Sequence, residues 1–485
     1  MRDTVIYGVG SEAGGDTVPD VLVVVVPGIG GSVLADPRDE SAAVWGARPG
    51  DVVDLVRHPD RLGLDRRLEP VGLIRSTSLL GFTIVPGYED LMRGLNSLGV
   101  TDERGDPCRP VPNATVVAAP YDFRRSIADA ARRLDAVVGA HLGDATEAER
   151  AGRVVVVGHS LGGLVARYWM GVMQRWPWCR SLVTIATPHR GAPKALGWWV
   201  NGPRVLGRTL KGPLRLVREW PSVAELLPRY EAVHDATTGT WCYPHDLPLP
   251  ALTGSARDAY ALHEQIEQSW GDMPRRGPEM LTWLGWSHPT AESAVWDGSG
   301  LEVAKVRPGW LAGSGWDRDL GDGTVPAISA VPIESSHHAG TITRLRARHV
   351  PMVNTPSVVA LLRGYLARAS IDWVRGDEDA DHPPALGLDL DELYAAGEPI
   401  PVAVAGREID PALGGRPVWA ALRPSGDEQA EPAEVRLARD DATGAFVGAF
   451  PGQSPGMYEV SVSVREVPGA GDLDVADTIA VLGDE

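Results

Sequence analysis

Apolar and polar positions alternate over residues 1–369 in a way that predicts strands and helices in turn. Residues 127–138 and 164–173 repeat apolar side chains at helical spacing. The mostly apolar runs, which are typical of strands buried on both faces, are residues 21–26, 115–118, 154–157 and 181–186. This alternation predicts an α/β domain with a mostly parallel sheet flanked by helices.

The pattern changes after residue 369. Residues 370–398 are rich in Asp, Glu and Pro, which predicts an acidic linker. Residues 399–485 hold short alternating or β-branched runs separated by turn signals, and in Tyr458–Val464 apolar side chains alternate with polar ones. Short strands at this spacing predict a small all-β sandwich, immunoglobulin-like in architecture, as an accessory domain.

The apolar run 154–157 leads directly into Gly158-His159-Ser160-Leu161-Gly162-Gly163 and then into a helical pattern. A serine on such a sharp strand-to-helix turn projects its hydroxyl from the end of the sheet, and glycines on both sides leave room for the strained backbone. Ser160 is therefore our candidate nucleophile. His159 is expected to be packed or hydrogen-bonded and not to act as its base.

A nucleophilic serine needs a carboxylate and a base, which follow it along the chain in this kind of fold. Asp322, in a Gly-Asp-Gly-Thr-Val-Pro turn, is the candidate carboxylate, the alternative being an ordinary turn aspartate. His349, in a loop before a helical run, is the candidate base. His337 and His338 compete with it, but their polar segment is typical of a solvated loop.

The oxyanion hole should combine two backbone N–H groups, one after the nucleophile and one from the loop after an early strand. Leu161 supplies the first and Ile29, in the Pro27–Ser32 loop, the second. The glycines of this loop lack the spacing of a phosphate-binding loop, and the pattern at Gly8–Ala13 runs into further glycines where a helix should begin. The three cysteines show no paired or zinc-type spacing, so we expect neither a cofactor nor a metal.

Six segments resemble the lecithin:cholesterol acyltransferase family and occur in its order. They are Val26–Ser32, Pro120–Arg124, Gly158–Gly163, Thr187–Pro193, Gly321–Pro326 and the segment around His349. The resemblance covers roughly residues 20–368. It implies an α/β-hydrolase fold, a catalytic triad of Ser160, Asp322 and His349, and an oxyanion hole from the amides of Ile29 and Leu161.

The same resemblance implies a serine-dependent lipase, phospholipase or acyltransferase that passes an acyl group from a lipid ester to water or to an alcohol. It also implies a lid at about 36–83 and a cap at about 190–320. Trp45 and Tyr88 are our candidates for substrate contact. The first cysteine is Cys108, so the disulfide that closes the lid in animal relatives cannot form here.

Tryptophan is concentrated in the expected cap. Ten of the 16 tryptophans lie between residues 190 and 320. They could face a lipid surface, because tryptophan suits the boundary between membrane and water, or they could pack inward. The pattern leaves both interpretations open.

Charge separates the two expected domains. Residues 370–485 contain 24 acidic residues and 7 arginines, a net charge of −17, whereas the whole chain carries −18. Such a domain should be repelled by nucleic acid and by anionic lipid, so we expect only transient membrane-surface contact through the other domain. The acidic domain could bind a protein partner or restrain access to the site.

No run of about 18 apolar residues exists, and Met1-Arg2-Asp3 leads into no signal-like segment, so a cytoplasmic location is expected. Two other functions remain open. One is a soluble carboxylesterase that acts on non-lipid esters, and the other is a catalytically inactive binding protein on a hydrolase scaffold.

Overall fold

A computed structural model provides the structure of this protein. It describes residues 21–46, 58–75, 77–79, 82–85, 87–202, 204–205, 208–209, 211–274, 277–311, 321–335, 342–367, 386–391, 393–405, 416–425, 430–441, 444–467 and 471–482. The segments at Gly8–Ala13 and at His337 and His338 lie outside these ranges.

The centre of the protein is a seven-stranded sheet in the order β18-β15-β10-β9-β1-β8-β7, and every adjacent pair of strands is parallel. The strands are β1 (Leu22–Val26), β7 (Thr101–Asp102), β8 (Val116–Ala118), β9 (Val154–His159), β10 (Cys179–Ile185), β15 (Glu279–Gly285) and β18 (Ile342–Leu345). The mostly parallel sheet predicted from the apolar runs is therefore confirmed, and it agrees with the α/β-hydrolase fold class that the family resemblance implied. The runs identified four of these strands and did not predict β7, β15 or β18.

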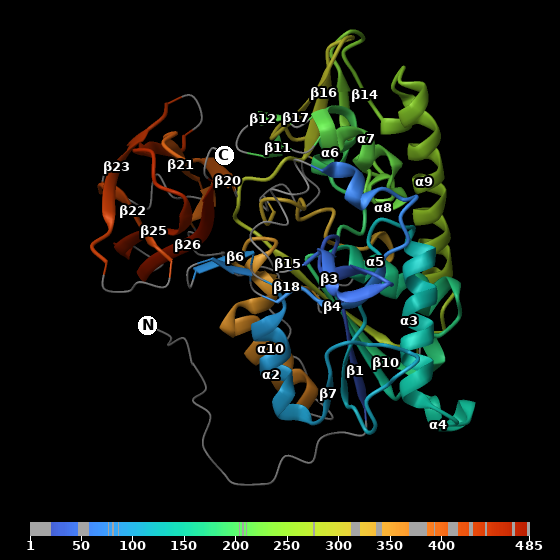
Figure 1. Cartoon of the computed structure of the whole chain (residues 1–485). Coiled ribbons are helices and arrows are strands. Elements are labelled where there is room, and N and C mark those ends of the chain that lie inside the picture. Colours follow the sequence, from blue (N-terminus) through green and yellow to red (C-terminus); the bar gives the residue numbers. More distant parts are fainter. Residues whose placement is uncertain are drawn as a thin grey trace, which may run out of the picture.

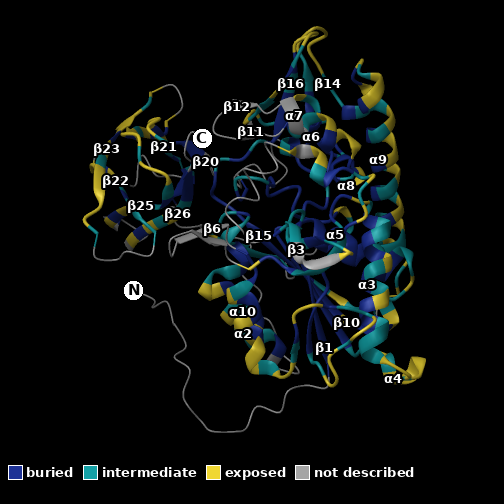
Figure 2. Cartoon of the chain, in the orientation of Figure 1, coloured by how far each residue is buried: buried dark blue, intermediate teal, exposed yellow. Residues whose placement is uncertain are grey.

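Helices cover both faces of this sheet (Figure 1). Helices α3 (Ile127–Leu142), α5 (Leu161–Arg167) and α9 (Pro250–Gly271) lie on one face, and α2 (Glu89–Leu95) and α10 (Pro356–Ala367) on the other. Alternate residues of β1 divide between two apolar clusters: Val24 packs with α3 and α5, and Val25 packs with α2 and α10. Burial on both faces explains why the four predicted strands β1, β8, β9 and β10 are mostly apolar runs. Figure 2 shows the buried sheet between helices whose outer faces are exposed.

The expected lid is a small antiparallel structure beside the sheet. It contains β2 (Ser32–Asp36), β3 (Asp39–Trp45) and β4 (Glu69–Leu73), followed by the hairpin of β5 (Thr77–Leu79) and β6 (Phe82–Val85). A short helix, α4 (Glu147–Arg150), precedes β9.

The expected cap is not one continuous insertion, because β15 lies within the 190–320 range and belongs to the central sheet. The other α-helices and strands described in this range are α6 (Pro193–Asn201), β11 (Arg204–Val205), β12 (Arg208–Thr209), α7 (Lys211–Glu219), α8 (Pro221–Ala224), β13 (Val233–Asp235), β14 (Thr240–Cys242), α9, β16 (Ser293–Trp296) and β17 (Leu301–Ala304). The cap prediction missed β15 because its Glu-Met-Leu-Thr-Trp-Leu-Gly sequence mixes polar and apolar residues.

Five of the nine tryptophans that the structure describes in this range pack inward. Trp199, Trp220, Trp283, Trp286 and Trp296 are buried, and Trp283 belongs to the central sheet. This finding favours the packing interpretation over a tryptophan-rich lipid surface. In the described part of the chain, no helix is both long enough and apolar enough to cross a bilayer.

The C-terminal domain is all-β: its eight strands are hydrogen-bonded in the order β19-β21-β24-β23-β22-β25-β26-β20 around the domain's own apolar cluster, an arrangement that resembles the predicted sandwich. Its strands are β19 (Gly387–Asp389), β20 (Leu393–Ala395), β21 (Ile400–Ala405), β22 (Val418–Pro424), β23 (Ala433–Arg439), β24 (Phe446–Phe450), β25 (Gly456–Val467) and β26 (Gly471–Leu482). Strands β19 and β20 lie within the range expected to be linker. That expectation was wrong for residues 386–398, because Leu386, Leu388 and Leu390 all point into the cluster. The immunoglobulin-like architecture stays a prediction.

Candidate active site

Ser160 lies on a strained turn between β9 and α5. Its backbone has a φ of 51° and a ψ of −124°, a conformation that non-glycine residues rarely adopt. A Cβ at Gly158 would lie 2.6 Å from Gly163 Cα, and a Cβ at Gly162 would overlap the carbonyl oxygen of Val26. The two glycines are therefore required by close backbone contacts at the turn, as the sequence predicted.

The structure brings the three predicted triad side chains together although they are far apart in the sequence. The His349 Nε2 atom lies 3.0 Å from Ser160 Oγ, and His349 Nδ1 lies 2.8 Å from Asp322 Oδ2. All three residues are buried or nearly so, with Ser160 5% and His349 9% exposed. This geometry is that of a nucleophile, a base and an orienting carboxylate.

Asp322 is held by backbone donors as well as by the histidine. Its Oδ1 atom accepts hydrogen bonds from the N–H groups of Thr324 at 2.9 Å and Val325 at 2.7 Å. Burial alone would raise the pKa of this carboxyl, but the interaction with His349 and the two backbone N–H groups outweigh it and lower the pKa. Asp322 is therefore ionised at neutral pH.

The loops that carry Asp322 and His349 are joined by their backbones. The His349 N–H donates to the Asp322 carbonyl at 3.0 Å, and the His288 N–H donates to the Gly321 carbonyl at 3.0 Å. His349 follows β18, and His288, which forms a parallel bridge with Asp322, follows β15, so both segments leave the same ends of two adjacent parallel strands. Adjacent parallel strands thus place the base and the carboxylate side by side.

The loop after β1 lies against the nucleophile. A Cβ at Gly28 would be only 2.9 Å from Ser160 Cβ, and the Tyr121 hydroxyl donates to the Pro27 carbonyl at 2.9 Å. Ile29 is the next residue of this loop, and Leu161 is the first residue of α5. In the described part of the chain, neither amide N–H donates a hydrogen bond to another protein group. The assignment of both amides to an oxyanion hole stays a prediction.

Tyr88, a candidate for substrate contact, lies beneath the site and is 5% exposed. Its oxygen accepts the Gly28 N–H at 2.7 Å and lies 2.7 Å from Nδ1 of His159. His159 Nε2 lies 3.1 Å from the His349 carbonyl, which can only accept, so Nε2 carries the proton and the Tyr88 hydroxyl donates to Nδ1. Burial, reinforced by nearby His349, lowers the pKa of His159 to about 3, consistent with this neutral form.

Tyr88 and His159 therefore connect the loop at Gly28 with the loop at His349. We propose that Tyr88 is a positioning residue, and its contact with the substrate stays a prediction. His159 is hydrogen-bonded, as the sequence predicted. The sequence offered no signal for the Tyr88–His159 pair, because 71 positions separate the two residues.

Replacing Tyr88 by phenylalanine is expected to lower turnover about tenfold and stability by about 1–3 kcal/mol, because the buried Gly28 N–H and His159 Nδ1 both lose their partner. Steady-state kinetics and thermal unfolding measure these effects. Tyr230→Phe is the matched control, since Tyr230 is also buried and its hydroxyl donates to the Glu292 carbonyl at 3.1 Å. Equal losses of turnover in both variants would contradict the positioning role.

Trp45, the other candidate for substrate contact, reaches the same loop from the lid. Its Nε1 donates to the Gly30 carbonyl at 2.8 Å, and its ring packs edge-on against Phe123 at 5.9 Å between centroids. Trp45 is partly exposed. Its contact with the substrate stays a prediction, and the structure adds that it connects the lid to the loop that carries Ile29.

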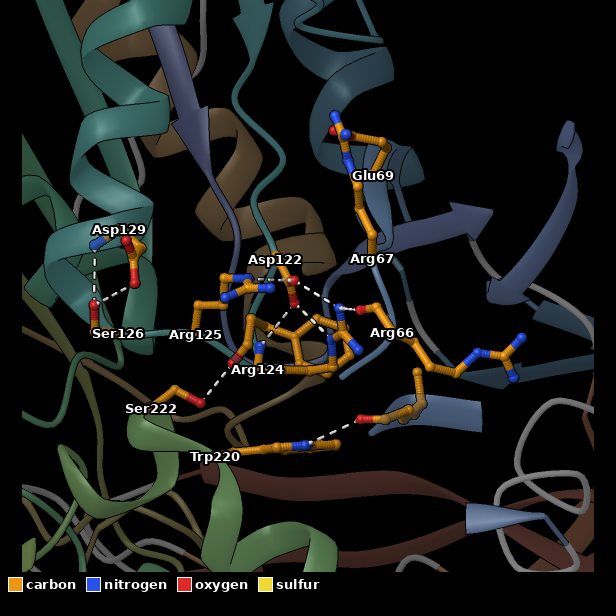
Figure 3. A network of polar contacts seen from close by, with 12 residues as sticks. Arg66, Arg67, Glu69, Asp122, Arg124, Arg125, Ser126, Asp129, Trp220 and Ser222 are labelled. Carbon is orange, nitrogen blue, oxygen red and sulfur yellow. Dashed lines mark hydrogen bonds and ion pairs between the residues drawn. The ribbon is translucent and has the colours of Figure 1, made fainter. Parts of the chain in front are cut away.

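The Tyr-Asp-Phe-Arg segment at residues 121–124 joins the lid to the core (Figure 3). Arg124 is fully buried and pairs with Asp122 at 2.7 Å, and its guanidinium also donates to the carbonyls of Gly63 at 2.6 Å and Arg66 at 3.1 Å. A buried guanidinium needs such a complete set of acceptors. The sequence identified this segment only through the family resemblance. Its role in joining the lid to the core depends on contacts with residues about 60 positions away, which no local pattern predicts.

The same segment also holds the cap. Phe123 packs edge-on against Trp220 at 5.7 Å, its carbonyl accepts the Ser222 hydroxyl at 2.5 Å, and Trp220 Nε1 donates to the Leu62 carbonyl at 3.2 Å (Figure 3). Residues 121–124 are therefore the point where lid and cap meet beside the loop after β1.

Buried histidines predict that acid destabilises the fold. Burial lowers the pKa of His159 to about 3, those of His263 and His288 to about 4, and that of His189 well below its usual value. The unfolded chain binds their protons below about pH 6.5. Each should therefore reduce the free energy of unfolding by up to about 1.4 kcal/mol per pH unit as pH falls from 6.5 toward 4.

Glu225 acts in the opposite direction, because burial raises its pKa to about 7 and its contribution to stability is lost as pH rises. Four histidines outweigh one glutamate, so we expect the melting temperature to fall steadily from pH 6.5 to 4.5. Calorimetry over this range checks the expectation, and an unchanged melting temperature would contradict it.

No group of His, Cys, Asp and Glu side chains in the described ranges is arranged to hold a metal ion.

Comparison with known proteins points to the same chemistry. Residues 110–240 match the family described as Lecithin:cholesterol acyltransferase, a range that includes Ser160 and the Tyr-Asp-Phe-Arg segment but neither Asp322 nor His349. The match supports acyl hydrolase or acyltransferase activity. None of the curated proteins matches the chain.

The comparison with solved structures returned chains of low identity and low TM-score. A chain of the Tle4–Tli4 complex is 16% identical, with a TM-score of 0.49, and the alignment covers 71% of this chain and 98% of that one. Bacillus licheniformis lipase BlEst2 in its propeptide form is 11% identical, with a TM-score of 0.37 and coverage of 95% and 93%. The lin2722 product of Listeria innocua is 11% identical, with a TM-score of 0.26 and coverage of 73% and 96%. The fold assignment rests on the sheet order and not on these similarities.

Proposed function

Because this chain is an α/β-hydrolase similar to the lecithin:cholesterol acyltransferase family, we propose that it is a serine-dependent lipid acyl hydrolase or acyltransferase that works through an acyl-enzyme on Ser160. The observation that carries the proposal is the continuous hydrogen-bonded series from Ser160 Oγ through His349 to Asp322, at 3.0 and 2.8 Å. The lipid substrate class comes from the family match.

In the first half of the reaction, Ser160 Oγ attacks the ester carbonyl carbon while His349 Nε2 accepts the hydroxyl proton. The carbonyl π electrons move to the oxygen, and the amide N–H groups of Ile29 and Leu161 stabilise this oxyanion. When the intermediate collapses, the bond to the leaving alkoxide breaks and His349 returns the proton to it. Ser160 then carries the acyl group.

In the second half, water or an alcohol attacks the acyl-enzyme while His349 accepts its proton. The tetrahedral intermediate releases Ser160 Oγ, which takes the proton back. Water as the acceptor yields a fatty acid, and an alcohol yields a new ester. Asp322 stabilises the imidazolium in both halves, because it is ionised and lies on Nδ1.

The experiment is acyl release from phosphatidylcholine vesicles, with and without a sterol, followed by mass spectrometry of the products. In parallel, a fluorophosphonate probe reports the reactive serine, and its site is mapped by peptide sequencing. We expect labelling at Ser160 and a serine-dependent fatty acid or sterol ester.

The alternative functions have different outcomes. Labelling of Ser160 with turnover of short soluble esters only would support a non-lipid carboxylesterase. Absence of labelling and of any product would support an inactive binding protein on the hydrolase scaffold. Either result would overturn the proposal.

A further inference from the structure

The C-terminal domain contacts the loop that carries the candidate base. Arg348 immediately precedes His349, and its guanidinium forms an ion pair with Asp477 of β26 and donates to the Leu390 carbonyl at 3.1 Å. Both partners of the ion pair are nearly buried, with side chains 11% and 8% exposed. A surface ion pair contributes little to stability, whereas loss of one partner from a buried pair is strongly destabilising because the other charge is left buried and unpaired.

The guanidinium of Arg348 also lies beside the loop of the candidate carboxylate. A Cβ at Gly323, the residue after Asp322, would be 3.4 Å from Arg348 Nε. Arg348 therefore lies between the two loops and the C-terminal domain, and its position is fixed by Asp477 from the domain side.

A second contact from the same domain reaches the carboxylate loop. Gly387, at the start of β19, lies so close to Ser287 that a Cβ at residue 387 would overlap the Ser287 carbonyl oxygen. His288, the next residue, forms a parallel bridge with Asp322. Figure 1 shows the domain beside this region of the catalytic domain.

We propose that the C-terminal domain is a positioning element of the active site, which holds the His349 and Asp322 loops through the Arg348–Asp477 ion pair and the Gly387–Ser287 contact. The proposal rests on the proposed function of Ser160, Asp322 and His349. Under this proposal the acidic domain supports catalysis, so weakening its contact with the triad loops should lower activity. If the domain instead restrained access to the site, the same change should raise activity.

The test uses the full chain and a soluble nitrophenyl ester, so that differences in lipid binding do not affect the measured kcat and KM. Arg348→Gln and Asp477→Asn are each expected to lower kcat about 10- to 100-fold while KM stays within twofold, because misplacement of a catalytic group by about 1 Å has effects of this size. The double variant should lose no more than the worse single variant, because both act through one pair. Asp477→Glu should recover most of the activity.

The matched control is Asp389→Asn. Asp389 lies in β19 between Gly387 and Leu390, and its partly exposed carboxylate forms an ion pair with Lys305, the residue after β17. This pair also joins the two domains but involves neither Arg348 nor a triad side chain. This variant should keep the kcat of the wild type. Equal losses in the Asp389 and Asp477 variants, an unchanged kcat in Asp477→Asn, or an increased kcat would each overturn the proposal, and an increase would support restraint instead.

A spectroscopic readout separates this proposal from the proposed function. The His349 Nδ1 proton, hydrogen-bonded to Asp322, should give a downfield NMR resonance that is lost or broadened in Asp477→Asn and retained in Asp389→Asn. If the wild type neither labels at Ser160 nor hydrolyses any ester, the proposed function fails, while this resonance still shows whether the domain positions the loop. A resonance unaffected by Asp477→Asn would overturn the positioning role.

Discussion

Replacing Ser160 by alanine is expected to lower acyl release roughly 10⁴- to 10⁶-fold, because the acyl-enzyme can no longer form. The residual rate would come from the oxyanion amides and from substrate binding alone. The fold should be retained, because among the described residues the Ser160 Oγ atom forms a hydrogen bond with His349 alone. The measurement is initial-rate mass spectrometry of released fatty acid from vesicles.

Ser222→Ala is the matched control for this variant. Ser222 is also a buried serine, but its hydroxyl donates to the Phe123 carbonyl and lies in the cap. It should cost stability and leave the chemistry largely intact. Acyl release that persists in Ser160→Ala at more than about one hundredth of the wild-type rate would contradict a serine nucleophile at this position.

Replacing Asp322 by asparagine is expected to lower kcat about 10⁴-fold with little change in KM. Two backbone N–H groups, of Thr324 and Val325, point at Oδ1, so the amide oxygen of an asparagine must take that place. Its NH₂ group then faces His349 Nδ1, where it can only donate. The imidazole is held with its proton on Nε2, and it cannot accept the proton of Ser160.

The control for this variant is Asp102→Asn. Asp102 is equally buried, lies 3.0 Å from the imidazole Nε2 of His141 and accepts three backbone N–H groups, but it lies outside the site. Its loss should lower the melting temperature and leave kcat near the wild-type value. If Asp322→Asn keeps more than about a tenth of the wild-type kcat, Asp322 is a turn residue and not the orienting carboxylate.

The positions of the candidate triad were predictable because local signals mark each residue. Ser160 lies between glycines on an apolar strand, and Asp322 lies in a glycine turn. Chain order reduced the remaining choice to a few histidines. Tyr88 shows where this reasoning ends, because its role depends on hydrogen bonds to Gly28 and His159 that no local pattern encodes.

Errors arose where strand and linker signals were weak. Strand β15 was assigned to the cap because polar residues interrupt its apolar pattern, although both of its neighbours in the sheet are parallel strands. Acidic residues similarly hid Leu386, Leu388 and Leu390, which alternate into the core of the C-terminal domain. The acidic residues predicted an exposed linker, and this prediction overlooked the alternating buried leucines that mark a strand.

The sequence by itself determined four strands of the parallel sheet, the strained turn at Ser160 and the order of the chemical groups, because burial on both faces and close glycine contacts restrict which residues can occupy these positions. Only the tertiary structure decided that Tyr88 supports the site, that residues 121–124 join lid and cap, and that Asp477 reaches Arg348. These last features are pairings between distant residues. Their free energy depends on burial and exact distance, and both exist only once the chain has folded.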